Sequence, residues 1–287
     1  MTAIDGGNAT SGANTYVLDG ADEDLRRLVA IADVTAGLTR TSLQRSGVGR
    51  GWSALDCGCG PLGALPILGE LVGPEGHVIG VDSNEAAVSD ARRHCHALGL
   101  EDVEFIAADA CQLDAEMLGG PVDVIYTRCF LMHQPDPAAM LRHLAGLLRP
   151  GGWLVALEPL PEPSPTSHPA NASLGDAWNL LHETIRAAGV PEHAVASLPA
   201  EARAAGLTVK YAGATSVLMS ARQGFELHAA TLDALSSRAA DLDVASTTEC
   251  HALATRLRDA SGGRYEWVTT PYYLDLALQR AVERPIG

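Results

Sequence analysis

The chain has 287 residues, of which 47% are hydrophobic and 5% aromatic, so it can bury one large core, or a core with a small cap, and is not a disordered chain. Thirty-five acidic residues against twenty basic ones produce a formal net charge of -15. Such a surface repels phosphate backbones and anionic lipids, which argues against a nucleic-acid or a membrane partner.

The N-terminal segment MTAIDGGNATSGANT has neither a basic nor an apolar stretch, and no apolar run approaches the length of a membrane span. We therefore expect a soluble, cytoplasmic protein. The six cysteines form no C-x-x-C pair, and Cys57 and Cys59 are too closely spaced for typical zinc ligation. Reduced thiols and no metal site are expected.

The first predicted helix follows a polar arm and spans residues 22–47. Its leucines and valines recur at helical spacing, and Gly47 is a suitable stop. We expect residues 1–50 to form an N-terminal arm and helix that act as a lid, and residues 51–287 to form the main domain.

From Trp52 onward, short apolar runs alternate with helical stretches, which is typical of a parallel sheet with crossover helices. The strands are predicted at residues 53–58, 77–82, 103–109, 122–128 and 152–159. The helices between them are predicted at residues 62–72, 84–98, 113–118 and 137–148. This order predicts a doubly wound α/β layer that binds its ligands at the carboxyl ends of the strands.

Four prolines in residues 160–169 indicate a loop that leaves the sheet after the fifth strand. Helices are then predicted within about residues 160–200 and 221–260, and we expect these insertions to form a helical cap. A sixth strand is predicted at residues 207–220 and a final one at 265–280. The sheet is therefore expected to have seven strands, most of them parallel.

The stretch LDCGCGPLGALP holds Gly58, Gly60 and Gly63 in the G-x-G-x-x-G spacing that bends a strand into a helix around a phosphate. Asp82 follows at the distance expected of an acid that binds a ribose. Taken alone, these residues fit a nicotinamide dinucleotide.

Three further features favour a different cofactor. Asp56 stands just before the first glycine, where a carboxylate repels pyrophosphate but accepts hydrogen bonds from an ammonium group. Asp109 ends the third predicted strand, where it can accept a hydrogen bond from an adenine amine. The sequence LRPGGWLV adds a Pro-Gly-Gly turn before the fifth strand.

Together, LDCGCGPLG, VIGVDSN, FIAADA and LRPGGWLV resemble, in order and spacing, the motifs of the class I S-adenosylmethionine-dependent methyltransferases. The resemblance is to the small-molecule branch of methyltransferase type 11, or UbiE-like, enzymes of specialised metabolism, and it covers roughly residues 50–160. It implies S-adenosylmethionine as the cofactor, S-adenosylhomocysteine as the product, and the Rossmann-like methyltransferase fold.

The resemblance also implies cofactor-binding residues at the ends of the first four strands. They are Asp56, Gly58 and Gly60 at the methionine end, Asp82 and Ser83 at the ribose, Asp109, Ala110 and Cys111 at the adenine, and Arg128 facing the sulfonium. Each of the three aspartates can instead be a helix cap or a turn residue.

The candidates for catalysis are His133, Glu158 and Tyr16. His133 is either a general base or a packing or cofactor contact. Glu158 ends the fifth strand and either points into the cleft or caps the following loop. Tyr16 lies in the N-terminal arm, where it either closes over the cofactor as part of a lid or only anchors the arm to the core.

We expect methyl transfer to the carbon, nitrogen or oxygen of a small bacterial natural product, such as an antibiotic or an alkaloid-like ring, for example an indole. A cyclase or pericyclase that keeps this fold and binds the cofactor without methyl transfer is an alternative. A nicotinamide-dependent oxidoreductase is another. The expected partner is a small-molecule substrate, and the helix before the first strand could pair two subunits as a homodimer.

Overall fold

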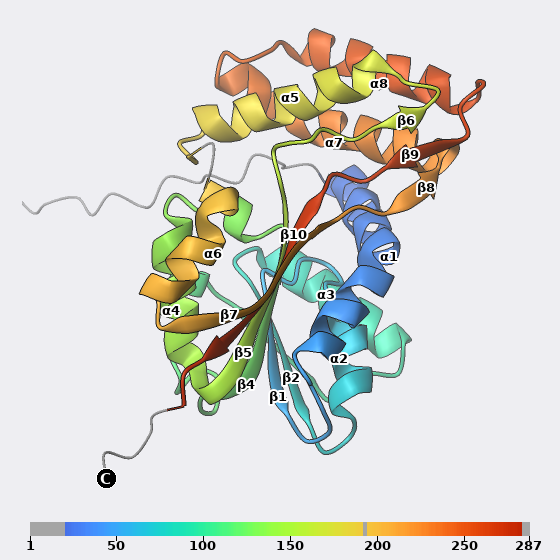
Figure 1. The fold of residues 1–287 in the computed structure, drawn as a ribbon. Helices are drawn as coiled ribbons and strands as arrows, with labels where there is room; N and C mark the ends of the chain where they lie inside the picture. The colour runs from blue at the N-terminus through green and yellow to red at the C-terminus, as the bar shows by residue number, and fades with distance from the viewer. Residues whose placement is uncertain (1–20, 192–193, 283–287) are drawn as a thin grey trace, which may run out of the picture.

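A seven-stranded sheet in the order β3-β2-β1-β4-β5-β10-β7 forms the centre of the computed structural model, which describes residues 21–191 and 194–282 (Figure 1). Strands β1 to β5 run parallel, and β10 runs antiparallel to both of its neighbours, β5 and β7. The strands are β1 (Ser53–Cys57), β2 (His77–Asp82), β3 (Val103–Ala107), β4 (Val122–Arg128), β5 (Leu148–Pro159), β7 (Leu207–Thr215) and β10 (Tyr273–Arg280). The predicted α/β fold class is confirmed.

Both faces of the sheet are covered by helices, as parallel sheets require. Successive side chains of a strand point to opposite faces, so Leu55 of β1 joins the core on one side and Ala54 joins the core on the other. Helices α2 (Leu65–Val72) and α3 (Glu85–Ala97) pack on the side of Ala54, and α4 (Pro137–Leu147) packs on the side of Leu55.

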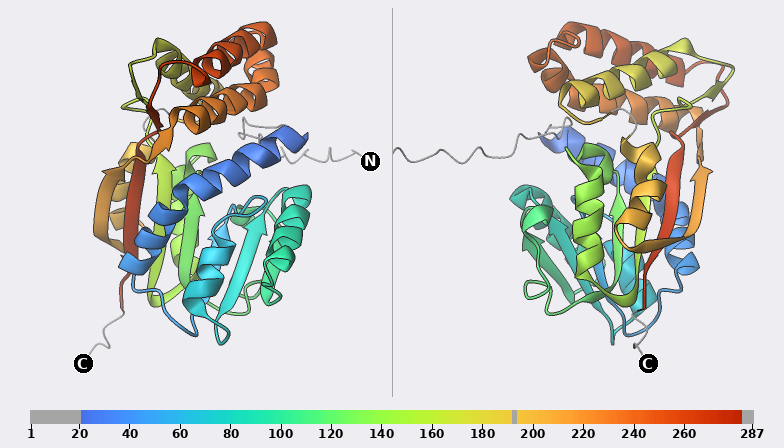
Figure 2. Two further views of the ribbon diagram at one scale, coloured as in Figure 1. Left: turned by 90° about the vertical axis from the view of Figure 1, so that its right-hand side faces the viewer. Right: turned by 60° about the vertical axis from the view of Figure 1, so that its left-hand side comes forward.

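Three further helices form a layer above the carboxyl ends of the strands (Figures 1 and 2). They are α5 (Ala172–Ala187), α7 (Ala221–Asp241) and α8 (Thr247–Ser261), and we call them the helical cap. A small sheet of β6 (Ser167–His168), β9 (Trp267–Thr269) and β8 (Leu218–Ser220) joins this layer. Apolar residues of the cap belong to the same core cluster as one face of the large sheet, so the two layers share one core.

Helix α1 (Ala21–Arg45) connects the two layers, because it contacts α7 in the cap and also α2 and β10. The side of α1 that faces the sheet carries polar residues that are fully buried, including Thr35 and Thr39. The Thr39 hydroxyl lies 2.8 Å from the hydroxyl of Tyr126 in β4. Buried hydrogen bonds therefore fasten α1 to the sheet in addition to apolar packing.

The short helix predicted at residues 113–118 does not form, and this part of the chain consists mainly of turns. A 3₁₀ turn, η1 (Ala110–Gln112), precedes it instead. Gly119 and Gly120 follow with φ of 70° and 137°. So few residues between two breaks cannot offset the cost of nucleating an α-helix.

Three later elements also differ from the prediction. The strand predicted at residues 207–220 is divided into β7, in the large sheet, and β8, in the small one. Helix α6 (Ala194–Ala204) begins within the predicted cap insertion 160–200 but packs beside the sheet, against α4 and β7. The final predicted strand is divided into β9 and β10 around Pro271, which has no N–H for the ladder. Within the described part of the chain, no helix has the length and apolarity needed to cross a bilayer.

Candidate functional site

The glycine motif forms a tight loop directly after β1. Gly58, Gly60 and Gly63 have φ of 75°, 56° and 58°, which glycine adopts without the strain that a Cβ would impose. A Cβ at Gly58 would lie 2.4 Å from the ring of Phe130, and one at Gly63 would lie 2.2 Å from the carboxylate of Asp56. A Cβ at Gly60 would meet nothing within 4 Å. Two of the glycines therefore allow close packing, whereas the third exposes backbone to open space.

Asp56 stabilises this loop through a buried hydrogen bond. Its side chain is only 2% exposed, and Oδ2 accepts a hydrogen bond from the Ala64 N–H at 2.6 Å. Burial raises the pKa of Asp56 to about 6, although the Ala64 hydrogen bond and the charge of Arg128 act in the opposite direction. One oxygen of the carboxylate is thus committed to shaping the turn.

Asp82 links the end of β2 to the glycine loop. Its Oδ2 accepts a hydrogen bond from the Gly60 N–H, and its Oδ1 accepts one from the Asn84 N–H, both at 2.9 Å. The cap of α3 is Asn84, whose side chain accepts from Ala86 and Ala87. Asp82 is therefore not the cap of α3. Ser83, between Asp82 and Asn84, is exposed.

Asp109, Ala110 and Cys111 stand at the end of the neighbouring strand β3. Oδ1 of Asp109 accepts a hydrogen bond from the Cys111 N–H at 2.9 Å, so Asp109 caps the turn η1. Ala110 is buried, whereas Asp109 and Cys111 are exposed. Because β1, β2 and β3 are adjacent and parallel, their carboxyl ends bring the glycine loop, Asp82 and Asp109 to one edge of the sheet.

Glu158 organises the loop that follows β4. Its fully buried carboxylate accepts hydrogen bonds from the Thr127 hydroxyl and the Met132 N–H at 3.2 Å, and from the Phe130 N–H at 3.3 Å. Burial raises the pKa of Glu158 to about 7, while the backbone hydrogen bonds lower it. These hydrogen bonds agree with the loop-capping alternative for Glu158, and its catalytic role stays a prediction.

His133 lies in the 3₁₀ turn η2 (Leu131–His133) that Glu158 holds. It is 7% exposed. Burial lowers the pKa of His133 to about 3, and Arg27 of α1 and His182 of α5 lower it further. An imidazole with a lowered pKa is neutral at physiological pH, and both alternatives for His133, a general base or a contact, stay predictions.

Arg128 and Tyr16 complete the predicted set. The guanidinium of Arg128 donates hydrogen bonds to Thr35 at 2.9 Å and to Thr39 at 3.5 Å. Arg128 therefore reaches toward α1, where buried threonines supply hydrogen-bond acceptors, and its predicted place beside the sulfonium stays a prediction. Tyr16 lies outside the described residues. Among the residues that the structure describes, no three His, Cys, Asp or Glu side chains are arranged to hold a metal ion.

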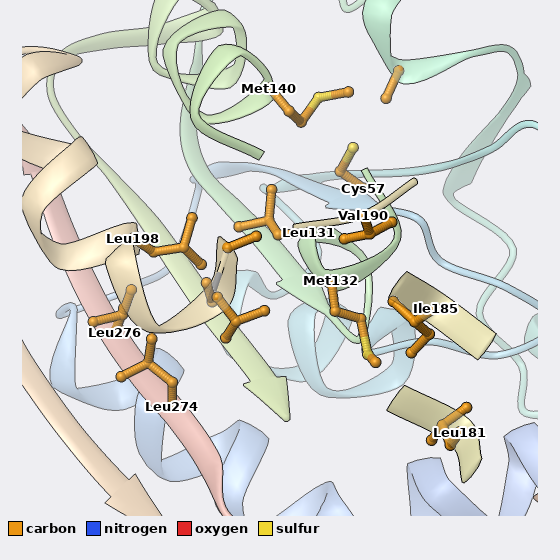
Figure 3. Close-up of a cluster of buried hydrophobic side chains, with 14 of the residues drawn as sticks. Cys57, Leu131, Met132, Met140, Leu181, Ile185, Val190, Leu198, Leu274 and Leu276 are labelled. Atoms are coloured by element: carbon orange, nitrogen blue, oxygen red, sulfur yellow. The ribbon is translucent and has the colours of Figure 1, made fainter. Parts of the chain in front are cut away.

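A cavity of about 150 Å³ lies beside η2, between that turn and helices α5 and α6. Apolar residues such as Met132, Ile185 and Val190 line it, together with His182 and the exposed polar residues Glu162, Asn179, Glu183 and Arg186. Figure 3 shows Met132 of η2 beside Ile185 and Leu181 of α5, with Val190 close by. Sequence reasoning placed His182 in the cap but missed the apolar walls, because such residues look like ordinary core.

Known proteins resemble this chain over about half of its length. The family described as methyltransferase domain matches residues 49–197. A demethylmenaquinone methyltransferase of Lactococcus lactis is 31% identical over 144 residues, which cover 50% of this chain and 54% of that protein. A trans-aconitate 2-methyltransferase of Methylobacterium radiotolerans is 34% identical over 132 residues, covering 43% and 47%. The chain thus spans about half the length of these curated relatives.

Solved structures agree over most of the chain. The YcgJ protein of Bacillus subtilis has a TM-score of 0.57 at 16% identity, covering 86% of this chain and 100% of the other. The [4+2]-cyclase SpnF has a TM-score of 0.54 at 21% identity, covering 86% and 81%. At such identities the likeness shows the fold alone. The family match over more than half of the chain, with the sheet order and glycine loop described above, shows that the chain belongs to the methyltransferase-domain family of class I S-adenosylmethionine-dependent methyltransferases.

Proposed function

We propose that this chain transfers the methyl group of S-adenosylmethionine to a small-molecule acceptor. The observation that carries the proposal is the open backbone at Gly60, hydrogen-bonded through its N–H to Asp82 at the edge where β1, β2 and β3 end. A substrate or cofactor can approach the backbone there without meeting a side chain.

The residues at this edge fit the cofactor. A carboxylate offers about four lone-pair sites, so Asp82 can accept from ribose hydroxyls while it holds the Gly60 and Asn84 N–H groups. Asp109 is exposed and uses Oδ1 for the turn η1, which leaves Oδ2 available for an adenine amine. Asp56 and the glycines would form the loop that binds the methionine end of the cofactor.

When bound, S-adenosylmethionine supplies an activated methyl group, so the protein's task is chiefly to position the acceptor and exclude water. Glu158 performs part of that task by fixing Phe130 and Met132, which lie between the glycine loop and the cavity. His133 stays neutral beside them and can hydrogen-bond without carrying charge into the site.

The acceptor is proposed to be a small natural product of specialised metabolism. The net charge of -15 disfavours nucleic acid and anionic membranes as partners. A 37.1 kDa protein encoded in a transposon of Streptomyces fradiae is 43% identical over 109 residues, covering 38% of this chain and 30% of that protein, which supports a bacterial origin. Homodimerisation stays a prediction.

Isothermal titration with S-adenosylmethionine and S-adenosylhomocysteine tests the cofactor. Wild type should bind both, and Asp82→Ala should weaken binding by about 1–3 kcal/mol because a charged hydrogen-bond acceptor is lost. Asp102→Ala, an exposed aspartate in the loop before β3, is the matched control and should bind as wild type does. The proposal would be overturned if a nicotinamide dinucleotide gave binding heat in this titration while S-adenosylmethionine and S-adenosylhomocysteine gave none.

Release of S-adenosylhomocysteine on feeding candidate acceptors separates a transferase from the cyclase alternative. A transferase releases one equivalent per methylated product. Consumption of an acceptor without that release, in protein that binds the cofactor, would support the cyclase reading.

A further inference from the structure

Arg128 places a positive charge between β4 and α1 without an acidic partner among the residues that the structure describes. It is the last residue of β4, and its Nη1 donates hydrogen bonds to the hydroxyls of Thr35 at 2.9 Å and Thr39 at 3.5 Å. Both threonines are fully buried. A charge that leaves bulk water is usually paired with an opposite charge, whereas this one meets only hydroxyl groups. The arrangement therefore points to an anionic ligand.

The two hydrogen bonds leave one edge of the guanidinium available. Both use Nη1, so Nε and Nη2 keep their N–H groups for another acceptor. These two nitrogens form the side-on edge of the group, which can donate two parallel hydrogen bonds to one carboxylate. Arg128 is half-buried, and neither nitrogen is enclosed by the described part of the chain. The hydroxyls of α1 thus orient the guanidinium while its binding edge stays accessible.

Asp56 carries the opposite charge on the same face of the sheet. It is paired with Tyr126 in the parallel register of β1 and β4, two residues before Arg128, so alternation directs both side chains to one face. Burial is the main influence on the pKa of Asp56, and the charge of Arg128 lowers it after the Ala64 hydrogen bond does. The two charged groups are near one another but form no ion pair, and Oδ1 of Asp56 accepts no hydrogen bond from a described residue. A carboxylate and a guanidinium placed in this way match the ammonium and the carboxylate of an α-amino acid.

Two molecules of the proposed reaction can present a carboxylate here. S-adenosylmethionine has an amino-acid end, and a guanidinium attracts its carboxylate but repels its sulfonium. An acidic acceptor offers the same group, which is already deprotonated at neutral pH and needs no general base.

We propose that Arg128 binds a ligand carboxylate through Nε and Nη2, and that Thr35 and Thr39 of α1 orient it for this contact. The carboxylate belongs either to the amino-acid end of the cofactor or to an acidic acceptor. The choice of these two ligands rests on the proposed function, but the preference of Arg128 for a carboxylate can be measured without methyl transfer.

The first pair of probes is S-adenosylhomocysteine and the same molecule without its carboxylate, compared by isothermal titration. If the cofactor supplies the carboxylate, wild type should bind S-adenosylhomocysteine at least about tenfold more tightly than the decarboxylated form, as expected for hydrogen bonds to a charged group. Arg128→Met should bring this ratio close to one by weakening S-adenosylhomocysteine alone. Arg128→Lys keeps the charge without the planar fork and should retain part of the ratio.

The second pair is benzoate and benzamide, which have similar shapes and differ in charge. Ligand-observed NMR follows their binding in protein saturated with S-adenosylhomocysteine and in protein without it. If the acceptor supplies the carboxylate, saturated wild type should prefer benzoate at least about tenfold. Arg128→Met should then lose this preference while its binding of the first pair stays as in wild type.

Two further variants separate ligand binding from a structural role. Arg142→Met makes the same change at an exposed arginine of α4 and should keep both wild-type ratios. Thr35→Val removes the nearer hydroxyl but leaves the guanidinium, so it should lower the preference for the carboxylate without abolishing it. Thermal melts establish that each variant is folded, and Thr35→Val and Arg128→Lys cover the case in which Arg128→Met does not fold.

The proposal would be overturned if wild type preferred the carboxylate in neither pair, or if the folded Arg128→Met variant kept the wild-type ratios. Failure of the methyltransferase proposal looks different, because neither S-adenosyl ligand would then bind wild type, and the benzoate preference alone would report on Arg128. S-adenosylhomocysteine binding that is unchanged in Arg128→Met, with no preference for benzoate, would overturn the role of Arg128 and leave the methyltransferase proposal intact.

Discussion

The buried carboxylate of Glu158 accepts a hydrogen bond from the backbone N–H of Met132 at 3.2 Å, although the two residues are 26 positions apart. The contact joins the end of β5 to the turn η2. Phe130 N–H is held by the other carboxylate oxygen. One glutamate thus fixes the segment that separates the glycine loop from the cavity, and its effect can be measured through pH.

Glu158→Gln should flatten the dependence of stability on pH. An unfolded glutamate titrates near pH 4.3, at about its ordinary pKa, whereas the pKa of folded Glu158 is raised to about 7. Between these values the folded protein keeps a proton that the unfolded chain has released, so stability falls as pH rises through this window. Urea unfolding at pH 5 and pH 7 should show a smaller fall in the variant.

Part of the fall should remain in that variant, because burial also raises the pKa of Asp56 to about 6. Glu116→Gln, at an exposed position, is the control and should keep the wild-type difference between pH 5 and pH 7. An unchanged difference in Glu158→Gln would mean that Glu158 does not hold its proton in this window.

Gly60→Ala should abolish cofactor binding at a modest cost in stability. Its φ of 56° strains an alanine, by about 1–2 kcal/mol, but the new methyl group meets no protein atom within 4 Å. Gly99→Ala has the same strain at φ 74° and equally open surroundings, far from the glycine motif in sequence. If both variants lose similar stability and only Gly60→Ala loses S-adenosylhomocysteine in a titration, the space at Gly60 is the cofactor's. Equal binding by both would contradict that.

Cys111 should report cofactor binding through its thiol. It is exposed, whereas Cys57, Cys59, Cys95 and Cys250 are buried. Partial burial and the carboxylate of Asp109 raise the pKa of the Cys111 thiol, so labelling should be slower than for free cysteine at pH 8 and should accelerate at higher pH. We expect saturating S-adenosylhomocysteine to slow labelling by a disulfide reagent at least about tenfold, and Cys111→Ser to lose the protected phase. If S-adenosylhomocysteine did not slow the labelling of Cys111, the adenine would not bind beside η1.

The Arg45–Asp275 pair should contribute more to stability than the exposed Arg40–Glu70 pair. Both have an N to O distance of 2.6 Å, but the Asp275 side chain is 1% exposed and the Glu70 side chain 65%. Arg45→Ala leaves a buried carboxylate without its partner and should cost about 3 kcal/mol. Asp275→Ala should cost less, because Arg45 is 30% exposed and lies over the Tyr211 ring. Urea unfolding of these variants beside Arg40→Ala, which should resemble wild type, tests this order.

Local sequence was sufficient for the first four parallel strands and for the residues at their carboxyl ends, but not for the antiparallel part of the sheet. Alternating apolar runs predicted β1 to β4 closely, and glycine spacing with acids at strand ends predicted which carboxyl ends meet. The sequence-based prediction failed at residues 113–118. The turn capped by Asp109 before this segment, and Gly119 and Gly120 after it, leave too few residues for the predicted helix. The prediction also failed for the position of α6. Its buried face could pack against a cap or against the sheet, and only the contacts with α4 and β7 distinguish the two.

What the sequence by itself determined, therefore, is the order of strands and helices, the glycine turn and the acids beside it, because these depend on periodicity and on residues close together in the chain. Only the tertiary structure decided that Glu158 caps a loop, that Arg128 reaches α1, and that His182 and Met132 of η2 line one pocket. These outcomes depend on burial and on contacts between distant segments, which set both the pKa of a side chain and the partners that it meets.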